Sequence, residues 1–120
     1  MLELLKKAPA RFKRSFGYSW NALKSTFAKE ESFRLETLAF AILLAVMAAC
    51  PWPAWKKLAM LACYLAIPLA ETLNSAIEDI CNLVTRDHAE LVKNAKDKGA
   101  LAVLFAIILN ALVLIALILA

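Results

Sequence analysis

Glycine and proline are scarce in this sequence of 120 residues, which contains two glycines and four prolines. A β-rich fold depends on frequent turns, and these two residue types dominate turns. Hydrophobic residues make up 62% of the chain. A soluble domain of this size exposes too much of its surface to bury so much apolar material, whereas lipid can cover it. The composition therefore predicts an all-α integral membrane protein.

The common phosphate-binding and metal-binding motifs are also absent. The sequence contains no G-x-x-x-x-G-K-[ST] and no G-x-G-x-x-G. Its three cysteines form no C-x-x-C pair, so we interpret them as small apolar packing residues. The net charge of +4 comes without a basic patch that carries base-stacking aromatics, and we expect no nucleic acid partner.

Three stretches are long and apolar enough to cross a bilayer. They cover residues 37–55, 58–84 and 99–120, and a span needs about 20 predominantly apolar residues. The first and third carry no charge, and Asn110 is the only strongly polar side chain of the third. We therefore expect a three-helix transmembrane domain over residues 37–120.

The basic residues predict the orientation of the spans. Eight lysines and arginines precede residue 37 and four lie between residues 85 and 98, whereas only Lys56 and Lys57 separate the first two spans. Basic residues are retained in cytoplasmic segments. We expect a cytoplasmic N-terminus, a cytoplasmic 85–98 loop and a C-terminus on the outer side.

Residues 1–36 read as an amphipathic helix in the cytoplasmic interface. No apolar core of a signal peptide follows Lys6 and Lys7. Instead, apolar side chains recur at spacings of three and four: Leu5, Ala8, Phe12, Phe16, Trp20, Leu23 and Phe27. Polar and basic residues fill the other faces, which is typical of a helix lying in the membrane surface. Pro9 suits the first turn of such a helix.

The second span carries polar residues where hydrocarbon is expected. Glu71, Asn74, Glu78 and Asn82 fall within a sector of roughly 80° on a helix. A charged side chain near the bilayer centre costs about 2.5 to 3.5 kcal/mol, whereas each large apolar residue returns only about 0.3 to 0.6 kcal/mol. The two glutamates cancel most of what the span gains by insertion, which suggests that they have a function.

Topology brings further polar groups to the same cytoplasmic boundary: Glu30, Arg34, Glu36, Lys96 and Asp97. Carboxylates there suit Mg²⁺, which accepts oxygen ligands and usually arrives with phosphates, and a lysine neutralises phosphate oxygens. Two other readings stay open from spacing alone. The charged groups could simply satisfy one another in a structural oligomer, or the intramembrane glutamates could bind protons or cations in a small transporter.

Two strings of residues resemble the signature of the small prokaryotic diacylglycerol kinase family. They are Glu71-Thr-Leu-Asn-Ser-Ala-Ile-Glu78 and, after a fixed distance, Lys93-Asn-Ala-Lys-Asp-Lys-Gly99. Upstream, Gly17-Tyr-Ser-Trp20 and residues 30–36 also look like that family's interfacial helix. The resemblance covers roughly residues 11 to 110 in collinear order.

The resemblance implies a homotrimeric lipid kinase of the bacterial inner membrane, with active sites formed between subunits. It implies transfer of the γ-phosphate of MgATP to the hydroxyl of diacylglycerol, which gives phosphatidic acid. By motif position, Glu71 is the general base, and Glu30 and Glu78 hold Mg²⁺. The residues matched to the nucleotide are Arg11, Tyr18, Ser19, Lys96 and Asp97. Three residues match positions that organise the site: Asn74, Arg34 and Glu36.

The chain also departs from the family pattern. Asn82 stands where an aspartate is common and Ala100 where a serine is common, and His88-Ala89 replaces a commoner Tyr-His pair. The same family includes undecaprenol kinases, so undecaprenol is the alternative lipid substrate. The Lys98-Gly-Ala100 run looks closer to the diacylglycerol branch.

Overall fold

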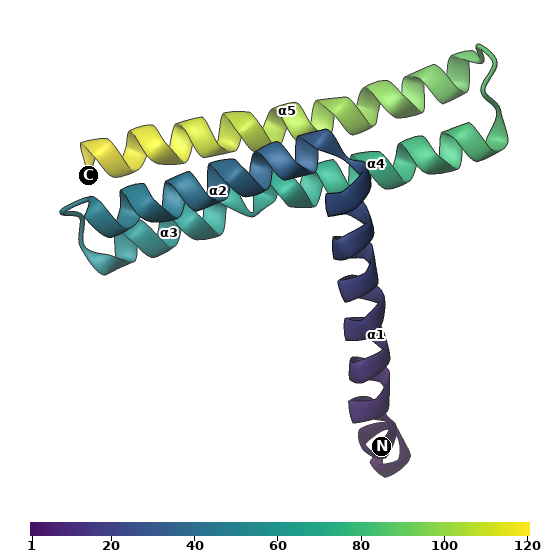
Figure 1. The fold of residues 1–120 in the computed structure, drawn as a ribbon, viewed down its shortest axis with the longest axis horizontal. Coiled ribbons are helices and arrows are strands. Elements are labelled where there is room, and N and C mark those ends of the chain that lie inside the picture. Colours follow the sequence, from purple (N-terminus) through teal and green to yellow (C-terminus); the bar gives the residue numbers. More distant parts are fainter. The chain divides into compact units, whose positions relative to one another are not determined.

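Five helices account for nearly all of the chain in the computed structural model, which describes residues 1–120. The structure contains no strand, which confirms the all-α prediction. The helices are, in chain order, α1 (Leu2–Lys29), α2 (Glu31–Ala49), α3 (Ala54–Tyr64), α4 (Ala66–Val84) and α5 (Glu90–Leu119). Figure 1 shows them along the sequence.

The chain divides into two units, Met1–Thr37 and Leu38–Ala120. The first unit consists of α1 and the first turns of α2. Helix α1 buries none of its residues, and aromatic side chains such as Phe12 and Phe16 are exposed along it. Pro9 lies inside this helix and not in its first turn, so that detail of the sequence reading was wrong. The helix begins at Leu2, which places Pro9 in its third turn and removes one backbone hydrogen bond there.

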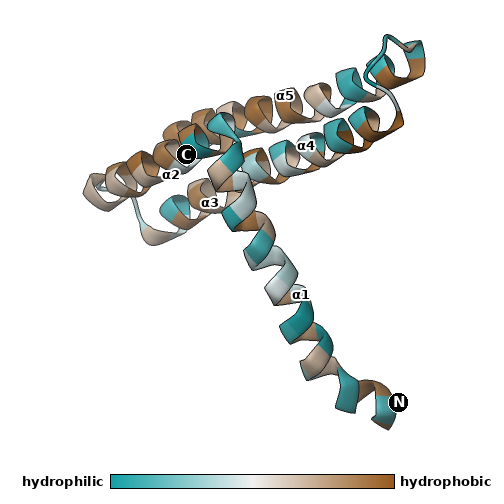
Figure 2. Ribbon diagram, turned by 45° about the vertical axis from the view of Figure 1, so that its right-hand side comes forward, coloured by the Kyte–Doolittle hydropathy of each residue, from teal (hydrophilic) through white to brown (hydrophobic).

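Most residues of the three candidate membrane-spanning segments belong to the second unit. Three segments are long and apolar enough to cross a bilayer: Glu31–Ala49, Ala54–Val84 and Glu90–Leu119. Very little of any of them is buried within one chain, because most large apolar side chains remain exposed. Figure 2 shows that apolar residues dominate α5 beyond its first turns. The protein is an all-α membrane protein whose apolar surface needs lipid or other subunits to cover it.

The helix ends differ from the limits of the uncharged stretches. Helix α2 ends at Ala49, six residues before the end of the expected first span, because Pro51 and Pro53 disfavour helix at the residues before them. Helix α5 begins at Glu90, nine residues before Gly99, so its first turns carry the charged residues of the expected loop. The polar connection between α4 and α5 is therefore short, covering residues 85–89.

The second span is interrupted at Leu65, where α3 ends and α4 begins. Pro68 explains the interruption, because it has no N–H to bond the Tyr64 carbonyl one turn earlier. The side chain of Asn110 of α5 reaches the backbone of α3 next to this break. Its Nδ2 donates to the backbone oxygen of Cys63 at 3.1 Å and to that of Ala106 at 2.9 Å. A partly buried interhelical hydrogen bond thus joins α5 to the break.

Helices α4 and α5 share the most extensive interface of the chain. Helix α4 runs beside the first part of α5, to which the 85–89 connection joins it, and α3 contacts the later part of α5 (Figure 1). Gly99 is one of the few buried residues of α5, and it lies against Asn74 of α4. This pairing places the polar face of α4 beside the first turns of α5.

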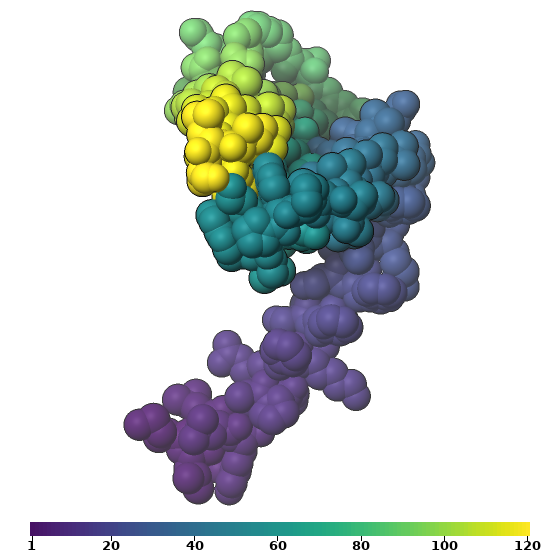
Figure 3. All heavy atoms as spheres, turned by 90° about the vertical axis from the view of Figure 1, so that its left-hand side faces the viewer, coloured from purple at the N-terminus to yellow at the C-terminus, as the bar shows by residue number.

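Lys56 fastens the opposite end of α5. Its Nζ donates to the backbone oxygens of Leu117 and Ala120 at 2.8 and 2.7 Å. The ammonium also lies 5.6 Å from the ring centroids of both Trp52 and Trp55. Figure 3 shows the end of α5 packed against this part of the chain. A cation at a helix C-terminus satisfies its last carbonyls and interacts favourably with the helix dipole.

Replacing Lys56 with methionine should destabilise the second unit. Lys56→Met leaves the last carbonyls of α5 without their donor in a buried setting, and we expect a loss of about 1 to 3 kcal/mol in the free energy of unfolding. Equilibrium unfolding in lipid–detergent micelles, followed by circular dichroism, measures this loss. Lys57→Met is the matched control, and an equal loss in both variants would contradict the assignment.

Candidate functional site

The polar face of α4 carries Glu71, Asn74 and Glu78 in successive turns. Asn74 Nδ2 lies 3.5 Å from Glu78 Oε1, at the outer limit of a hydrogen bond. Glu78 is exposed, whereas Glu71 and Asn74 are half-buried. Since a helix rises about 1.5 Å per residue, Glu71 lies about 10 Å from Glu78 along the axis. The face therefore presents two carboxylates at different depths with an amide between them.

Gly99 of α5 restricts the Asn74 side chain. A methyl group at position 99 would overlap Asn74 Oδ1 and would lie 3.2 Å from Asn74 Cγ and 3.6 Å from Asn74 Cα. Only glycine allows α5 to approach this closely without displacing the amide. Asn74 Oδ1 is buried and accepts no hydrogen bond from this chain. The amide is thus held beside Glu78 with an oxygen that lacks a donor.

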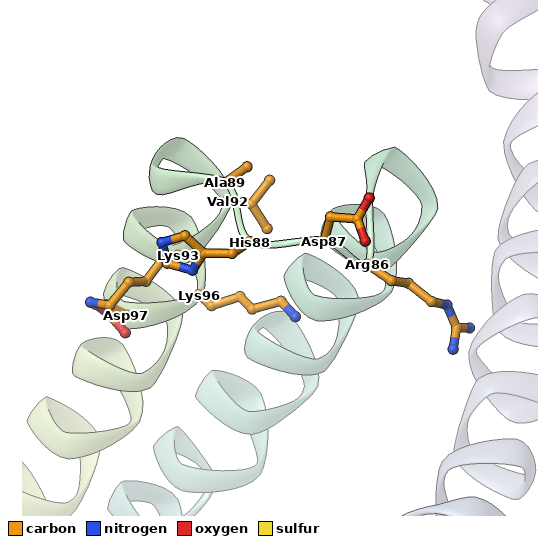
Figure 4. A pocket seen from close by; sticks show the side chains of 8 residues that line it. All are labelled: Arg86, Asp87, His88, Ala89, Val92, Lys93, Lys96 and Asp97. Carbon is orange, nitrogen blue, oxygen red and sulfur yellow. The ribbon is translucent and has the colours of Figure 1, made fainter.

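The first turns of α5 add two polar pairs. Lys93 Nζ forms an ion pair with Asp97 Oδ2 at 2.7 Å, and both side chains are well exposed. Lys96 Nζ donates to Asn82 Oδ1 of α4 at 2.9 Å. The two lysines point in different directions: Lys96 reaches towards α4, whereas Lys93 and Asp97 lie on the side of α5 away from it (Figure 4).

A pocket of about 350 Å³ lies at the connection between α4 and α5. It brings Lys96 and Asp97 together with other residues, shown in Figure 4: Arg86, Asp87, His88, Ala89, Val92 and Lys93. The lining contains three permanent cations against two carboxylates. Its chemistry suits a polyanion such as a phosphate chain, because cations and backbone N–H groups neutralise phosphate oxygens.

The remaining predicted site residues belong to the first unit and are described within it. Arg11, Tyr18 and Ser19 are exposed residues of α1. Glu30 is the extended residue between α1 and α2, and its backbone N–H donates to the Thr26 oxygen at 2.8 Å.

Two further residues lie in the first turns of α2. Arg34 Nη1 donates to the Ala28 oxygen at 3.3 Å, near the end of α1. Glu36 is half-buried. These contacts stabilise the turn around Glu30, while the site roles of Glu30, Arg34 and Glu36 remain predictions.

Within one chain, no three His, Cys, Asp or Glu side chains come together as a metal-binding group. The α4 face nevertheless offers oxygen ligands of the kind that Mg²⁺ prefers, the Glu78 carboxylate and the buried Asn74 Oδ1. Protein sites often hold Mg²⁺ through one or two carboxylates and complete its shell with phosphates and water. The α4 face fits such a partial site.

Three residues of this region had no site role in the sequence reading. The ion pair of Lys93 with Asp97 was detectable, because oppositely charged residues four apart face each other on a helix. Asn82 was visible as the next residue of the polar face, but its contact with Lys96 depends on the packing of α4 on α5. The role of Gly99 depends on the same packing.

Comparisons with known proteins find similarity over most of the chain. The family model for prokaryotic diacylglycerol kinase matches residues 17–119. The diacylglycerol kinase of Escherichia coli (strain K12) is 38% identical over 101 residues, covering 82% of this chain and 80% of that protein. The diacylglycerol kinase of Sinorhizobium sp is 35% identical over 81 residues, covering 68% and 59%. That of Haemophilus influenzae is 31% identical over 90 residues, covering 75% and 76%.

The two glycines of the chain provide a paired test of the contact with Asn74. Gly99→Ala forces a methyl group onto the Asn74 amide, and we expect a loss of about 1 to 3 kcal/mol in the free energy of unfolding. Gly17→Ala meets no atom within 4 Å, and alanine stabilises a helix by up to about 1 kcal/mol relative to glycine. Unfolding of both variants in lipid–detergent micelles gives the comparison. Equal effects of the two substitutions would show that the approach at Gly99 is not tight.

Proposed function

Because the chain belongs to the prokaryotic diacylglycerol kinase family, a family of ATP-dependent lipid kinases, we propose that it phosphorylates diacylglycerol. The γ-phosphate of MgATP passes to the free hydroxyl of the lipid, and the products are phosphatidic acid and ADP. The observation that carries this proposal is the polar face of α4 beside the basic first turns of α5. It sets two carboxylates and a lysine along one pair of packed helices.

Glu71 is the proposed general base. It takes the proton of the lipid hydroxyl while the hydroxyl oxygen attacks the γ-phosphorus and ADP leaves. Its place on α4 suits this role, because it lies about 10 Å from Glu78 along the helix and further from the charged 85–89 connection. A base at that depth meets a lipid hydroxyl without requiring the substrate to leave the membrane.

Glu78 and Glu30 are the proposed ligands of Mg²⁺, which neutralises phosphate charge when it is bound. The support for Glu78 is its carboxylate beside the Asn74 amide. The support for Glu30 is its match to the family motif. The Asn74 side chain packs against Gly99 and is proposed to orient the polar side chains of the α4 face. Arg34 and Glu36 have supporting roles around Glu30.

Lys96 and Asp97 are proposed to contact the nucleotide. Both line the pocket at the α4–α5 connection, where positive charge exceeds negative charge. Phosphoryl transfer depends mainly on positioning and on neutralising charge, and Lys96 supplies a donor for the phosphates. Arg11, Tyr18 and Ser19 of α1 complete the nucleotide contacts in this proposal.

The protein has an apolar groove, near the proposed base, that suits the acyl chains of the lipid. A groove of about 370 Å³ is lined almost wholly by apolar side chains of α2, α3, α4 and α5. Ile67 lines the groove and lies four residues, about one helical turn, before Glu71 on the same face of α4. A lipid whose chain lies along this groove brings its polar end towards Glu71.

The proposed oligomeric state and membrane location are those expected of the family. We propose a homotrimer whose active sites are shared between subunits, in the bacterial inner membrane. The N-terminus and the 85–89 connection face the cytoplasm and the C-terminus faces the periplasm. The distribution of lysine and arginine supports this orientation. The extensive exposed apolar surface of a single chain supports assembly in lipid.

Removing the acid–base function of Glu71 should abolish turnover. Glu71→Gln keeps the size and polarity of the side chain but cannot take a proton, so we expect the rate of lipid phosphorylation to fall by at least about 100-fold. The assay follows transfer of labelled γ-phosphate from MgATP to diacylglycerol in mixed micelles. Asp79→Asn is the matched control, since it removes an exposed carboxylate of α4 outside the polar face. Undiminished turnover in Glu71→Gln would refute the base assignment.

A direct comparison of lipids tests the proposed substrate. We expect kcat/KM for diacylglycerol to exceed that for undecaprenol by at least about tenfold, a difference of about 1.4 kcal/mol in transition-state binding. Both lipids are presented in the same micelles with the same MgATP concentration. A higher value for undecaprenol would keep the lipid kinase and replace its substrate. Phosphorylation of neither lipid would reject the kinase proposal.

A further inference from the structure

Asn110 is a polar side chain near the middle of an otherwise apolar span, and it has no role in the reaction described above. It is 8% exposed. Its Nδ2 donates to the backbone oxygens of Cys63 at 3.1 Å and Ala106 at 2.9 Å, whereas its Oδ1 is buried and has no partner in this chain. Polar side chains at this depth are costly. The hydrogen bond that Asn110 donates to another helix is the contact that offsets this cost.

The acceptor of that bond lies at the break in the second span. Helix α3 ends at Tyr64 and α4 begins at Ala66, so Cys63 belongs to the last turn of α3, whose carbonyls lack donors within their own helix. Pro68 removes a further donor, because proline has no N–H. Backbone groups in the middle of a bilayer find no water to bond. Asn110 therefore supplies a donor at the point where the second span lacks its own.

Asn110 lies on the face of α5 that packs against the second span. The buried residues of α5 form one stripe: Gly99, Ala106, Asn110 and Leu117. Asn110 comes 11 residues after Gly99 on α5. Asn74, which lies against Gly99, comes 11 residues after Cys63 on the second span. Eleven residues are close to three helical turns of about 3.6 residues each, so the two contacts follow one line between antiparallel helices.

Glu71 lies on the second span between these two contacts. It precedes Asn74 by three residues, about 4.5 Å along the helix, and follows Cys63 by eight residues, about 12 Å. On one side of Glu71, the close approach of Gly99 to Asn74 holds α4 against α5. On the other side, the hydrogen bond of Asn110 ties the end of α3 to α5. Without this bond, the first turns of α4 would be free to move at the break and would carry Glu71 with them.

We propose that Asn110 is a positioning residue for Glu71: its Nδ2 fastens the break in the second span to α5 and so fixes the first turns of α4 where the carboxylate meets the lipid hydroxyl. This inference rests on the proposed function, because it assumes that Glu71 is the general base. Asn110 acts through the backbone and takes no part in the proton transfer. Its effect is expected in kcat and not in KM for MgATP, because the pocket that contains Lys96 and Asp97 lies at the other end of α4.

Asn110→Leu is the most direct test, because it keeps a branched side chain, removes the donor and does not weaken membrane insertion. We expect the backbone amides of residues 66–72 to exchange with deuterium at least about tenfold faster. Those of residues 100–106 of α5 should change by less than about twofold. Hydrogen-exchange mass spectrometry in lipid–detergent micelles measures both segments.

The same variant should lower kcat for diacylglycerol about tenfold, while KM for MgATP stays within about twofold. The rate is measured at saturating lipid, because Asn110 also lines the apolar groove. A role confined to general stability predicts no such division between kcat and KM.

Two controls separate positioning from general effects. Asn94→Leu makes the same substitution at an exposed residue of α5 that lines neither the pocket nor the groove, and both readouts should stay within about twofold of the original. Pro68→Ala restores an N–H to the second span, so that a continuous helix supplies its own donors. In that background, Asn110→Leu should change exchange and kcat by less than about twofold. Equal effects of Asn94→Leu, or an undiminished effect of Asn110→Leu beside Pro68→Ala, would overturn the proposal.

Exchange and turnover report on the two proposals separately. Exchange that accelerates equally in α4 and α5, or local acceleration with unchanged kcat, would refute the positioning role while the kinase stands. If the original protein phosphorylates no lipid, the proposed function fails. Faster exchange confined to residues 66–72 in Asn110→Leu would then still support the fastening of α4 by Asn110, and its absence would refute that fastening.

Discussion

The free-energy cost of placing polar side chains in a membrane-spanning helix is the main constraint on this structure. Glu71 and Glu78 stand on α4 within the second candidate span, and each charged residue at the bilayer centre costs about 2.5 to 3.5 kcal/mol. Glu71 and Asn74 of this face are half-buried, whereas Glu78 is exposed near the basic first turns of α5. Most of the remaining apolar surface is left for lipid or neighbouring subunits.

Close contact between α4 and α5 makes the arrangement specific. Gly99 lets the helices approach at Asn74, and the Lys96–Asn82 hydrogen bond joins them nearer the connection. At the far end, Lys56 satisfies the last carbonyls of α5, so this helix is held near both ends. The mutual-satisfaction reading explains some of these contacts, such as Lys93 with Asp97. It does not explain the excess of cations over carboxylates in the lining of the pocket at the 85–89 connection.

Much of this architecture was predictable because hydrophobic periodicity and charge follow from local sequence. The apolar stretches indicated three spans, and the E-x-x-N-S-A-x-E string identified the family. The break at Leu65 was missed, although Pro68 removes a backbone hydrogen bond at this point and so favours it. The burial of Lys56 was also missed, because it depends on the distant end of α5. The contact of Asn82 with Lys96 joins residues 14 apart across two helices, and no local pattern encodes such a contact.

The stability of the Glu71→Gln protein tests most directly whether this carboxylate is present for catalysis. If Glu71 is retained for chemistry at a cost to membrane insertion, then its replacement by an uncharged residue of the same size should leave the free energy of unfolding equal or higher. Reversible unfolding of the original and variant proteins in lipid–detergent micelles gives this value. A loss of about 2 kcal/mol or more would show that the carboxylate holds the fold together, and would contradict the account.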